Sequence, residues 1–357
     1  MKSILDLFCG MVRVDSESRN EGPFVEYASK LLAEELGADC RLDAYGNLVA
    51  RIAAKASQAA TVALCAHADT VKPGVGIEPV VGEDRVIRSK GETILAADDK
   101  AGLAQIIDAV RASERRPPVE IVITLGEEVG LLGSRNLDVS MVDAKVAFVV
   151  DGEHLHDVVI GGPTHIGLDI TVIGKAAHAG MRPEEGISAV RVAATAITRM
   201  PEGRIDPETT ANVGTIEGGV VRNGVPERCT LKAECRSLSD AKAVAQARAM
   251  REAFETAASE AGAKVEIEET VYYRAHAIDP EAPVVRAASD AVRSIGLEPD
   301  VRVITGGTDA LILCNKGIDA VVLGTGGYDA HSTSEYISVE NLEKGASLVR
   351  SLLESLA

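Results

Sequence analysis

The sequence predicts an α/β domain that is interrupted by a smaller α+β domain, and three observations support this prediction. The chain has 357 residues, roughly twice the length of a usual single domain. Strand-like and helix-like segments alternate at both ends of the chain, which is typical of an α/β sheet covered on both faces. In the middle the order changes to strand-helix-strand-strand-helix-strand, as in a ferredoxin-like α+β sandwich. We expect the first domain at 1–162 plus 275–357 and the inserted domain at 163–274.

The α/β domain begins with a helix over 23–36, where apolar side chains recur at helical spacing up to Gly37. Strands are expected at 46–53 and 61–67, and the second reads Thr-Val-Ala-Leu-Cys-Ala-His. A continuous apolar run of this length suits a strand that is buried on both faces. One helix and two strands complete this part, at 100–112, 119–125 and 145–150.

The inserted domain begins after the turn Gly161-Gly162-Pro163. Residues 165–174 alternate between apolar and polar side chains, as an antiparallel strand does. A helix, two strands, a long helix and a last strand follow, at 186–199, 211–217, 226–236, 240–261 and 264–272.

After about residue 275 the first pattern resumes. Helices and strands alternate again, at 282–295, 301–304, 308–316, 319–323 and 339–356. The simplest account is one α/β domain that the middle segment interrupts.

The composition excludes several classes of function. The formal net charge is −17 and no basic run is present, which argues against nucleic acid and anionic membranes as partners. No apolar stretch reaches the roughly 18–20 residues of a membrane helix, and the first residues lack the apolar centre of a signal peptide. The six cysteines form no CxxC pair, so we interpret them as reduced core residues. We expect a cytoplasmic protein with no nucleic-acid or membrane partner.

Two pairs of polar side chains could bind metal ions. His67 and Asp69 come directly after a predicted strand and share a face, so one can bind a metal while the other hydrogen-bonds its ring. Asp98 and Asp99 enter the next helix, where they are either metal ligands or caps of the helix. Taken alone, each pair also fits a purely structural role.

Further candidates follow later strands. Glu127 and Glu128 come directly after the strand 119–125, and adjacent carboxylates repel each other unless a cation lies nearby. One of them can therefore ligate a metal while the other reaches a metal-bound water. Asp151 and His331 also follow predicted strands. We expect all of these side chains at the carboxyl edge of one parallel sheet, where α/β sheets bind ligands.

The motifs, in this order, resemble those of the M20 metallopeptidases. The resemblance extends over nearly the whole chain and includes Gly174-Lys-Ala-Ala-His-Ala-Gly180 of the inserted domain. Two carboxyl-terminal motifs are most similar to the tripeptidase-T-like branch: Gly306-Gly-Thr-Asp309 and Gly-Tyr-Asp-Ala-His331-Ser-Thr-Ser-Glu-Tyr-Ile. The resemblance implies a phosphorylase/hydrolase-like zinc-peptidase domain with an inserted lid or dimerisation domain.

The resemblance also implies two divalent metal ions per chain. One ion would be bound by His67, Asp98 and Asp151. The other would be bound by Asp98, Glu128 and His331, so that Asp98 bridges the pair. Zinc suits carboxylate and imidazole ligands, and cobalt or manganese could replace it.

Catalytic groups beside the metals are implied by the same resemblance. Glu127 would be the general base, which takes a proton from water and returns it to the leaving amine. The nucleophile would be a metal-bridging hydroxide. Asp69 would orient His67, and the peptide bond after Asp98 would be cis.

The inserted domain is expected to contact the substrate. The resemblance implies that His178 reaches an active site, commonly across a homodimer, and stabilises the tetrahedral oxyanion. Asn223 and Arg236 match positions that bind the carbonyl or carboxylate of the substrate. For Arg236 a surface salt bridge, and for His178 an exposed turn position, are the alternatives.

We therefore expect a metal-dependent aminopeptidase that acts on tripeptides or similar short peptides. The alternative within the same chemistry is an amidohydrolase or carboxypeptidase that acts on N-acyl amino acids or a small amide metabolite. A catalytically silent metal-binding or scaffold protein is a further alternative, although it would not need Glu127. Thr305 stands where tripeptidase T is expected to have arginine, so strict tripeptide specificity stays open. We interpret His154 and His156 as loop residues, although their spacing could also bind a metal.

Overall fold

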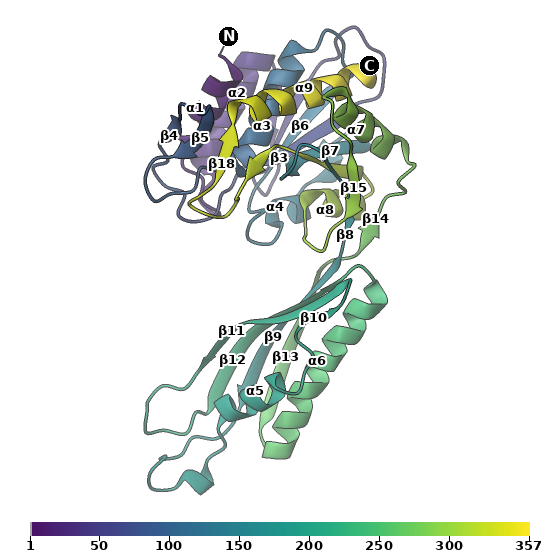
Figure 1. Cartoon of the computed structure of the whole chain (residues 1–357). Coiled ribbons are helices and arrows are strands. Elements are labelled where there is room, and N and C mark those ends of the chain that lie inside the picture. Colours follow the sequence, from purple (N-terminus) through teal and green to yellow (C-terminus); the bar gives the residue numbers. More distant parts are fainter. Residues whose placement is uncertain (1) are drawn as a thin grey trace. The chain divides into compact units, whose positions relative to one another are not determined.

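The computed structural model describes residues 2–357, which divide into two compact units (Figure 1). Unit 1 runs up to Gly161 and resumes at Ala277–Ala357, and unit 2 is Gly162–His276. Each unit has a sheet and a hydrophobic core of its own. None of the helices in residues 2–357 is both long and apolar enough to cross a membrane.

A nine-stranded sheet forms the centre of unit 1 within the described chain, in the order β1-β2-β6-β3-β7-β16-β8-β14, with β15 paired to β8. The strands are β1 (Asp39–Leu42), β2 (Leu48–Ile52), β3 (Val62–His67), β6 (Val119–Thr124), β7 (Val146–Gly152), β8 (Asp157–Gly162), β14 (His276–Ala277), β15 (Asp300–Val303) and β16 (Asp319–Gly324).

The sheet is mixed, and the prediction of one parallel sheet was wrong for part of it. Strands β6, β3, β7 and β16 are parallel neighbours, so their carboxyl ends meet at one edge. Strand β2 is antiparallel to β6, and β8 is antiparallel to β16. Local apolar runs identify buried strands, but strand direction depends on pairing between distant segments.

Helices cover both faces of this sheet, as predicted. Every residue of β3 is buried, and its side chains alternate between two cores. Leu64 and Ala66 face the larger core, which includes residues of α1 (Ile4–Val12), α2 (Gly22–Leu36), α3 (Ala97–Ala112), α7 (Pro283–Ser294) and α9 (Val339–Ser355). Ala63 and Cys65 face the other core, which includes Ala310 and Leu313 of α8 (Asp309–Asn315).

Several short elements have no signal in the sequence. A four-stranded sheet, in the order β17-β18-β5-β4, joins β4 (Pro79–Val81) and β5 (Val86–Ser89) to β17 (Gly327–Tyr328) and β18 (Tyr336–Ser338). Helix α4 (Leu132–Asn136) and the 3-10 turns Val139–Met141 and Pro183–Glu185 are equally short. Elements of two to five residues are too short to show a periodic pattern. The small sheet matters for function because its β17–β18 loop carries His331.

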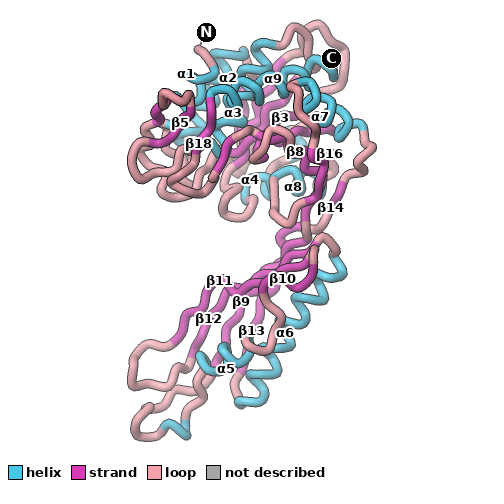
Figure 2. Tube along the Cα trace, in the orientation of Figure 1, coloured by secondary structure: helices cyan, strands magenta, loops and turns pink. Residues whose placement is uncertain are grey.

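Unit 2 has the predicted ferredoxin-like arrangement with one additional strand (Figure 2). Its antiparallel sheet has the order β10-β11-β12-β9-β13. The inward side chains of β9, such as Leu168 and Ile170, form a core with α5 and α6. The elements are β9 (Thr164–Ile173), α5 (Ala189–Ile197), β10 (Gly203–Asp206), β11 (Thr209–Gly218), β12 (Arg228–Ser237), α6 (Asp240–Ala261) and β13 (Lys264–Tyr273).

Candidate metal centre

The five side chains predicted as metal ligands lie together at the carboxyl edge of the parallel strands. His67 is the last residue of β3, Glu128 lies four residues beyond β6, and Asp151 is near the end of β7. His331 comes from the β17–β18 loop and has a left-handed backbone with φ of 64°. Asp98 reaches the site from the first turn of α3, at the start of a helix as the sequence predicts.

Asp98 lies between the two histidines. Its Oδ1 is 2.9 Å from Nε2 of His67, and its Oδ2 is 3.2 Å from Nε2 of His331. Asp151 Oδ1 lies 3.5 Å from Nε2 of His67, and Glu128 Oε2 lies 2.8 Å from Nε2 of His331. Each histidine therefore has a carboxylate of its own and shares Asp98 with the other. The Asp98–Asp99 peptide bond is cis, as the family resemblance implies.

The donor set fits a pair of divalent cations. His67, Asp98 and Glu128 each offer a ligand atom within 4.8 Å of the others, and so do His67, Asp99 and Asp151. Nitrogen and oxygen donors of this kind suit zinc and related metals. Buried carboxylates that lie close together destabilise the folded state unless a positive charge lies nearby. Cations at this position would therefore offset that destabilisation.

The protonation of the cluster reflects the same crowding. Burial raises the pKa of Asp151 to about 7, and the neighbouring Asp98 adds to the increase. Burial by itself lowers the pKa of His67, but the Asp151, Asp69 and Asp98 carboxylates raise it well above its usual value. Hydrogen bonds to Asp98 and Glu128 raise the pKa of His331 to about 10. The carboxylates of the cluster thus favour the cationic form of both histidines.

Asp69 connects His67 to the Glu127–Glu128 turn. Its fully buried carboxylate accepts hydrogen bonds from the backbone N–H groups of Glu127 and Glu128, at 2.9 and 3.2 Å, and from the Ser18 hydroxyl at 2.8 Å. Nδ1 of His67 donates to the backbone carbonyl of Asp69 at 2.9 Å, whereas the carboxylate Oδ1 is 3.6 Å away. Because a carbonyl can only accept, Nδ1 carries a proton and Nε2 is the atom that can bind a metal.

Glu127 and Asp99 are the remaining acidic residues of the predicted motifs. Burial raises the pKa of Glu127 well above its usual value, and Asp151, Asp309 and Glu128 add to the increase. A carboxyl group in this condition takes up a proton readily at neutral pH. The carboxylate of Asp99 accepts a hydrogen bond from the backbone N–H of His67 at 3.2 Å, so it has a structural task beside its closeness to Asp151.

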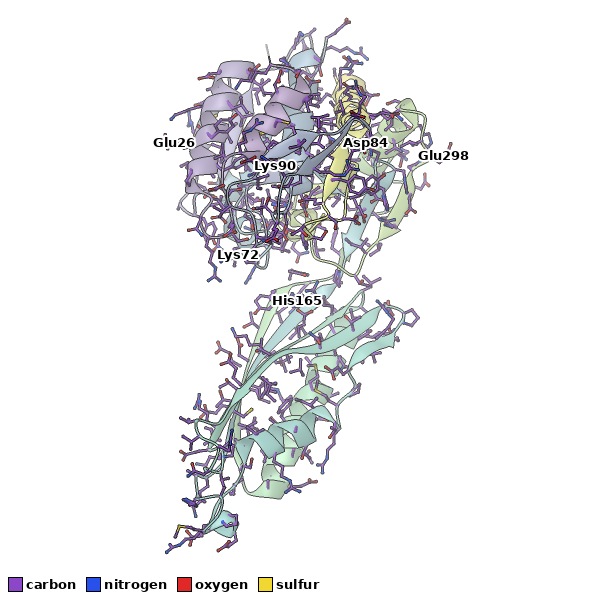
Figure 3. The ribbon with its side chains drawn as sticks, turned by 60° about the vertical axis from the view of Figure 1, so that its left-hand side comes forward. Glu26, Lys72, Asp84, Lys90, His165 and Glu298 are labelled. Carbon is purple, nitrogen blue, oxygen red and sulfur yellow. The ribbon has the colours of Figure 1, made fainter. Side chains whose placement is uncertain are left out.

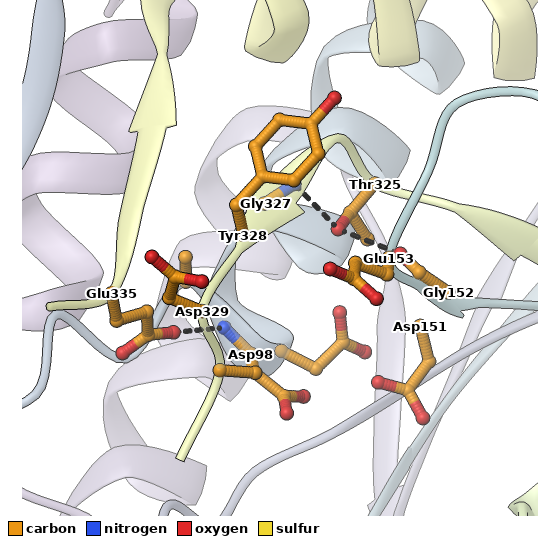
Figure 4. Close-up of a pocket in the computed structure, with 12 residues that line it drawn as sticks. Asp98, Asp151, Gly152, Glu153, Thr325, Gly327, Tyr328, Asp329 and Glu335 are labelled. Atoms are coloured by element: carbon orange, nitrogen blue, oxygen red, sulfur yellow. Dashed lines mark hydrogen bonds between the residues drawn. The ribbon is translucent and has the colours of Figure 1, made fainter. Parts of the chain in front are cut away.

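A cavity of about 270 Å³ adjoins Asp98 and Asp151 (Figure 4). Glu153, Tyr328, Asp329 and Glu335 also line it, and none of them was predicted as a site residue. None of the described residues 2–357 contributes a basic side chain to the lining of this cavity. The only sequence signal for these residues is that each stands within four positions of Asp151 or His331.

Aromatic rings fix Tyr328 at the cavity. Its ring centroid lies 5.3 Å from that of Tyr336 and 5.4 Å from that of His154. His154 in turn stacks on His156 at 5.3 Å, in the turn between β7 and β8. His156 lies near two carboxylates, but Arg302 pairs with both of them, Asp157 at 3.0 Å and Asp300 at 2.5 Å. The two histidines thus lie outside the five-residue cluster, as loop residues.

Unit 2 brings two of its three predicted substrate residues together. The backbone of His178 bridges to that of Gly224, and Ala179 N–H donates to the carbonyl of Asn223 at 2.9 Å. Arg236 is separate, because it lies opposite His165 in the sheet register, whereas His178 follows the far end of β9. Ten residues of strand separate these ends by about 30 Å.

Arg236 is held in an ionic network in unit 2. Its guanidinium donates two hydrogen bonds to Glu234, at 3.1 and 3.2 Å, and Glu234 lies 2.8 Å from Nε2 of His165. Figure 3 labels His165 at one end of this sheet. Hydrogen bonds from His165 and Arg236 lower the pKa of Glu234 to about 2. The salt bridge that is the alternative role for Arg236 is therefore present, and its role in substrate binding stays a prediction.

The fold and this donor set define an α/β metalloenzyme of the hydrolase class. A family model described as "Peptidase dimerisation domain" matches residues 160–262, and one described as "M42 glutamyl aminopeptidase" matches residues 72–177. YqjE of Bacillus subtilis, an uncharacterized protein, is 36% identical and spans 100% of this chain and 99% of its own length.

Two solved structures are similar over nearly the full length. Aminopeptidase PepT from Bacillus cereus is 38% identical, with a TM-score of 0.88 over 99% of this chain and 98% of its own. A tripeptidase from Staphylococcus aureus is 33% identical, with a TM-score of 0.91 over 99% and 97% of the two chains. The chain belongs to the M20 metallopeptidase family, in its peptidase-T-like branch. It is an enzyme of the metallopeptidase class, and the predicted fold is confirmed.

Proposed function

We propose that this protein is a two-metal aminopeptidase that cleaves tripeptides or similar short peptides. The observation that carries the proposal is Asp98, which presents one carboxylate oxygen to each of two histidines. The full-length similarity to an aminopeptidase and to a tripeptidase supports the peptide substrate.

The metal pair would be divided between two sets of ligands. His67, Asp98 and Asp151 would hold one ion, and Asp98, Glu128 and His331 would hold the other. The short distances between these donors support the division. Zinc is the metal we propose, because imidazole and carboxylate donors in a compact cluster favour it.

Glu127 would move the proton during cleavage. The bound metals would supply Lewis-acid polarisation of the scissile carbonyl and a lowered pKa of water. Glu127 would accept a proton from the attacking water and deliver it to the leaving amine, and burial, which raises its pKa, favours the uptake of the proton. Asp69 would hold Glu127 in place through the backbone hydrogen bond, and would orient His67.

The cavity beside Asp98 and Asp151 supports an aminopeptidase over an amidohydrolase that acts on N-acyl substrates. Glu153 and Asp329, which are in neither ligand set, also line it, and these two carboxylates would attract the free α-ammonium group of a peptide. N-acyl amino acids lack this cation. The alternative hypothesis, an amidohydrolase that acts on acylated metabolites, is therefore less favoured.

Unit 2 would complete the active site in a homodimer. We propose that His178 stabilises the oxyanion and that Asn223 and Arg236 bind the substrate's carbonyl or carboxylate. The match of residues 160–262 to a peptidase dimerisation domain supports this assembly. Since His178 and Arg236 lie at opposite ends of one sheet, they would serve two different active sites.

We propose that the enzyme acts in the cytoplasm. All six cysteines are free in the structure, which suits a reducing compartment.

The test is hydrolysis by metal-stripped protein, before and after addition of zinc, cobalt or manganese. The panel holds di- and tripeptides, the same peptides with an acetylated amino terminus, and N-acyl amino acids. We expect cleavage to return with metal and to require a free amino terminus. Preferential cleavage of acylated substrates would support the amidohydrolase hypothesis. Cleavage without metal would exclude the metal-dependent mechanism.

A further inference from the structure

Glu335 is a buried carboxylate that neither the ligand sets nor the proton transfer uses. It is 2% exposed and stands four residues after His331 in the sequence. Its Oε2 accepts hydrogen bonds from the backbone N–H groups of Leu95 and Ala96, at 2.7 and 2.8 Å. Its Oε1 accepts a third from the backbone N–H of Asp98, at 3.0 Å, which Figure 4 draws as a dashed line.

The backbone around Asp98 is shaped to receive a carboxylate. Ala96 has a left-handed conformation with φ of 61°, and a left-handed residue within a turn lets successive N–H groups converge on one anion. The first turn of α3 departs from helical geometry at Asp98 and Asp99, so its N–H groups need partners other than the usual carbonyls. Glu335 supplies such partners, from a segment 237 residues further along the chain.

The segment that bears Glu335 is itself tied to the His331 loop. Glu335 N–H donates to the carbonyl of Ser332 at 3.2 Å, and the Ser332 hydroxyl donates to the carbonyl of Asp329 at 2.8 Å. These two hydrogen bonds therefore connect the turn around His331 to Glu335. A movement of the Glu335 carboxylate would change the position of Asp98 relative to His331.

We propose that Glu335 is a positioning residue that fixes the bridging carboxylate Asp98 against the His331 loop, and so sets the affinity of the metal pair. The inference rests on the ligand assignment in the proposed function. A carboxylate that hydrogen-bonds the backbone beside a ligand acts on metal affinity without touching the metal, as partners behind metal ligands do. Three backbone N–H groups, those of Leu95, Ala96 and Asp98, donate hydrogen bonds to one buried carboxylate, and this restricts the backbone at Asp98 before a metal arrives.

The first test is Glu335→Gln, a nearly isosteric change. The amide NH₂ cannot accept a hydrogen bond, so one side of the group would oppose backbone N–H donors. We expect the affinity for the weaker-bound of the two metals, measured by competition with a chelator, to fall about 10–100-fold. The visible absorption spectrum of the cobalt-loaded protein should also change, because the ligand geometry changes. The matched control is Glu343→Gln, an exposed glutamate on α9, which should leave affinity and spectrum unchanged.

The second test uses the unaltered chain and can be carried out even if Glu335→Gln does not fold. Hydrogen exchange is followed for the segment 93–99 with and without zinc. We expect the amides of Leu95, Ala96 and Asp98 to be protected in both states, since their acceptor belongs to the protein. Fast exchange of these amides without metal would overturn the proposal, and so would metal affinity in the folded variant equal to that of the unaltered chain. Neither measurement uses a substrate, so a failure of the proposed peptidase activity would be seen separately.

Discussion

At the scale of single residues, Asp69 and Asp98 each serve several groups with one carboxylate. Asp98 offers one oxygen to each histidine, which is the geometry that a bridging ligand requires. Asp69 holds the backbone of Glu127 and Glu128, while its carbonyl fixes the protonated Nδ1 of His67. The family resemblance implied that Asp69 orients His67, and its hold on the two glutamates is added by the structure.

The role proposed for Glu127 gives a prediction at this scale. We expect Glu127→Gln to lower kcat by about 10²–10⁴-fold, because the amide cannot accept a proton. Metal content should stay near two per chain, since Glu127 is in neither proposed ligand set. The measurements are steady-state kinetics on a tripeptide and elemental analysis of the purified variant. Loss of metal together with activity would instead make Glu127 a ligand.

At the scale of elements, the close packing of α3 on β7 positions two of the ligands. Gly102 lies in α3, and a Cβ atom there would be 1.9 Å from the carbonyl oxygen of Val150 and 2.3 Å from Oδ1 of Asp99. A side chain at this position would push α3, which carries Asp98 in its first turn, away from β7, which carries Asp151 near its end. The absence of a side chain at Gly102 therefore permits the distances found in the cluster.

Gly102→Ala tests this packing. We expect unfolding in urea to show a loss of about 3 kcal/mol, because the added methyl group overlaps backbone that cannot move freely. Metal affinity should fall as well. The control is Gly22→Ala in α2, where a Cβ would meet no atom within 4 Å and stability should change by less than about 1 kcal/mol. Equal effects of the two substitutions would show that α3 can shift without cost.

At the scale of the whole molecule, the two units have separate cores. The core of unit 2 is made by residues of its own sheet, with α5 and α6, and includes Leu168 of β9. A unit with its own buried core can fold independently. The net charge of −17 favours solubility of the chain but says nothing about which unit binds substrate.

We predict that residues 162–276, expressed alone, unfold cooperatively in urea. Leu168→Ala should lower the stability of this fragment by about 2–5 kcal/mol, because it leaves a cavity in the core. Thr171→Ala, on the other face of the same strand, should have a much smaller effect. Far-UV circular dichroism measures both transitions. A gradual transition in the unaltered fragment would mean that unit 2 depends on unit 1.

Most of the longer elements and the motifs on them could be predicted from the sequence, because their signals are local, but α1 and β8 were not predicted. The apolar run before His67 identifies β3 whatever surrounds it, and Gly37 ends α2 as predicted, with φ of 65°. The direction of β2 and the small sheet around His331 could not be predicted. Pairing of short strands depends on partners that are remote in the sequence, and two or three residues carry no period.

The sequence by itself determined the fold class, the family and the residue types that can form a two-metal site. These depend on local patterns and on motifs whose order is preserved along the chain. Only the tertiary structure decided that Asp98 faces both histidines, that Asp69 holds the Glu127 turn and that Glu335 holds the backbone of Asp98. The reason is physical: each of these contacts joins segments 31 to 237 residues apart, and folding alone brings them within hydrogen-bond distance.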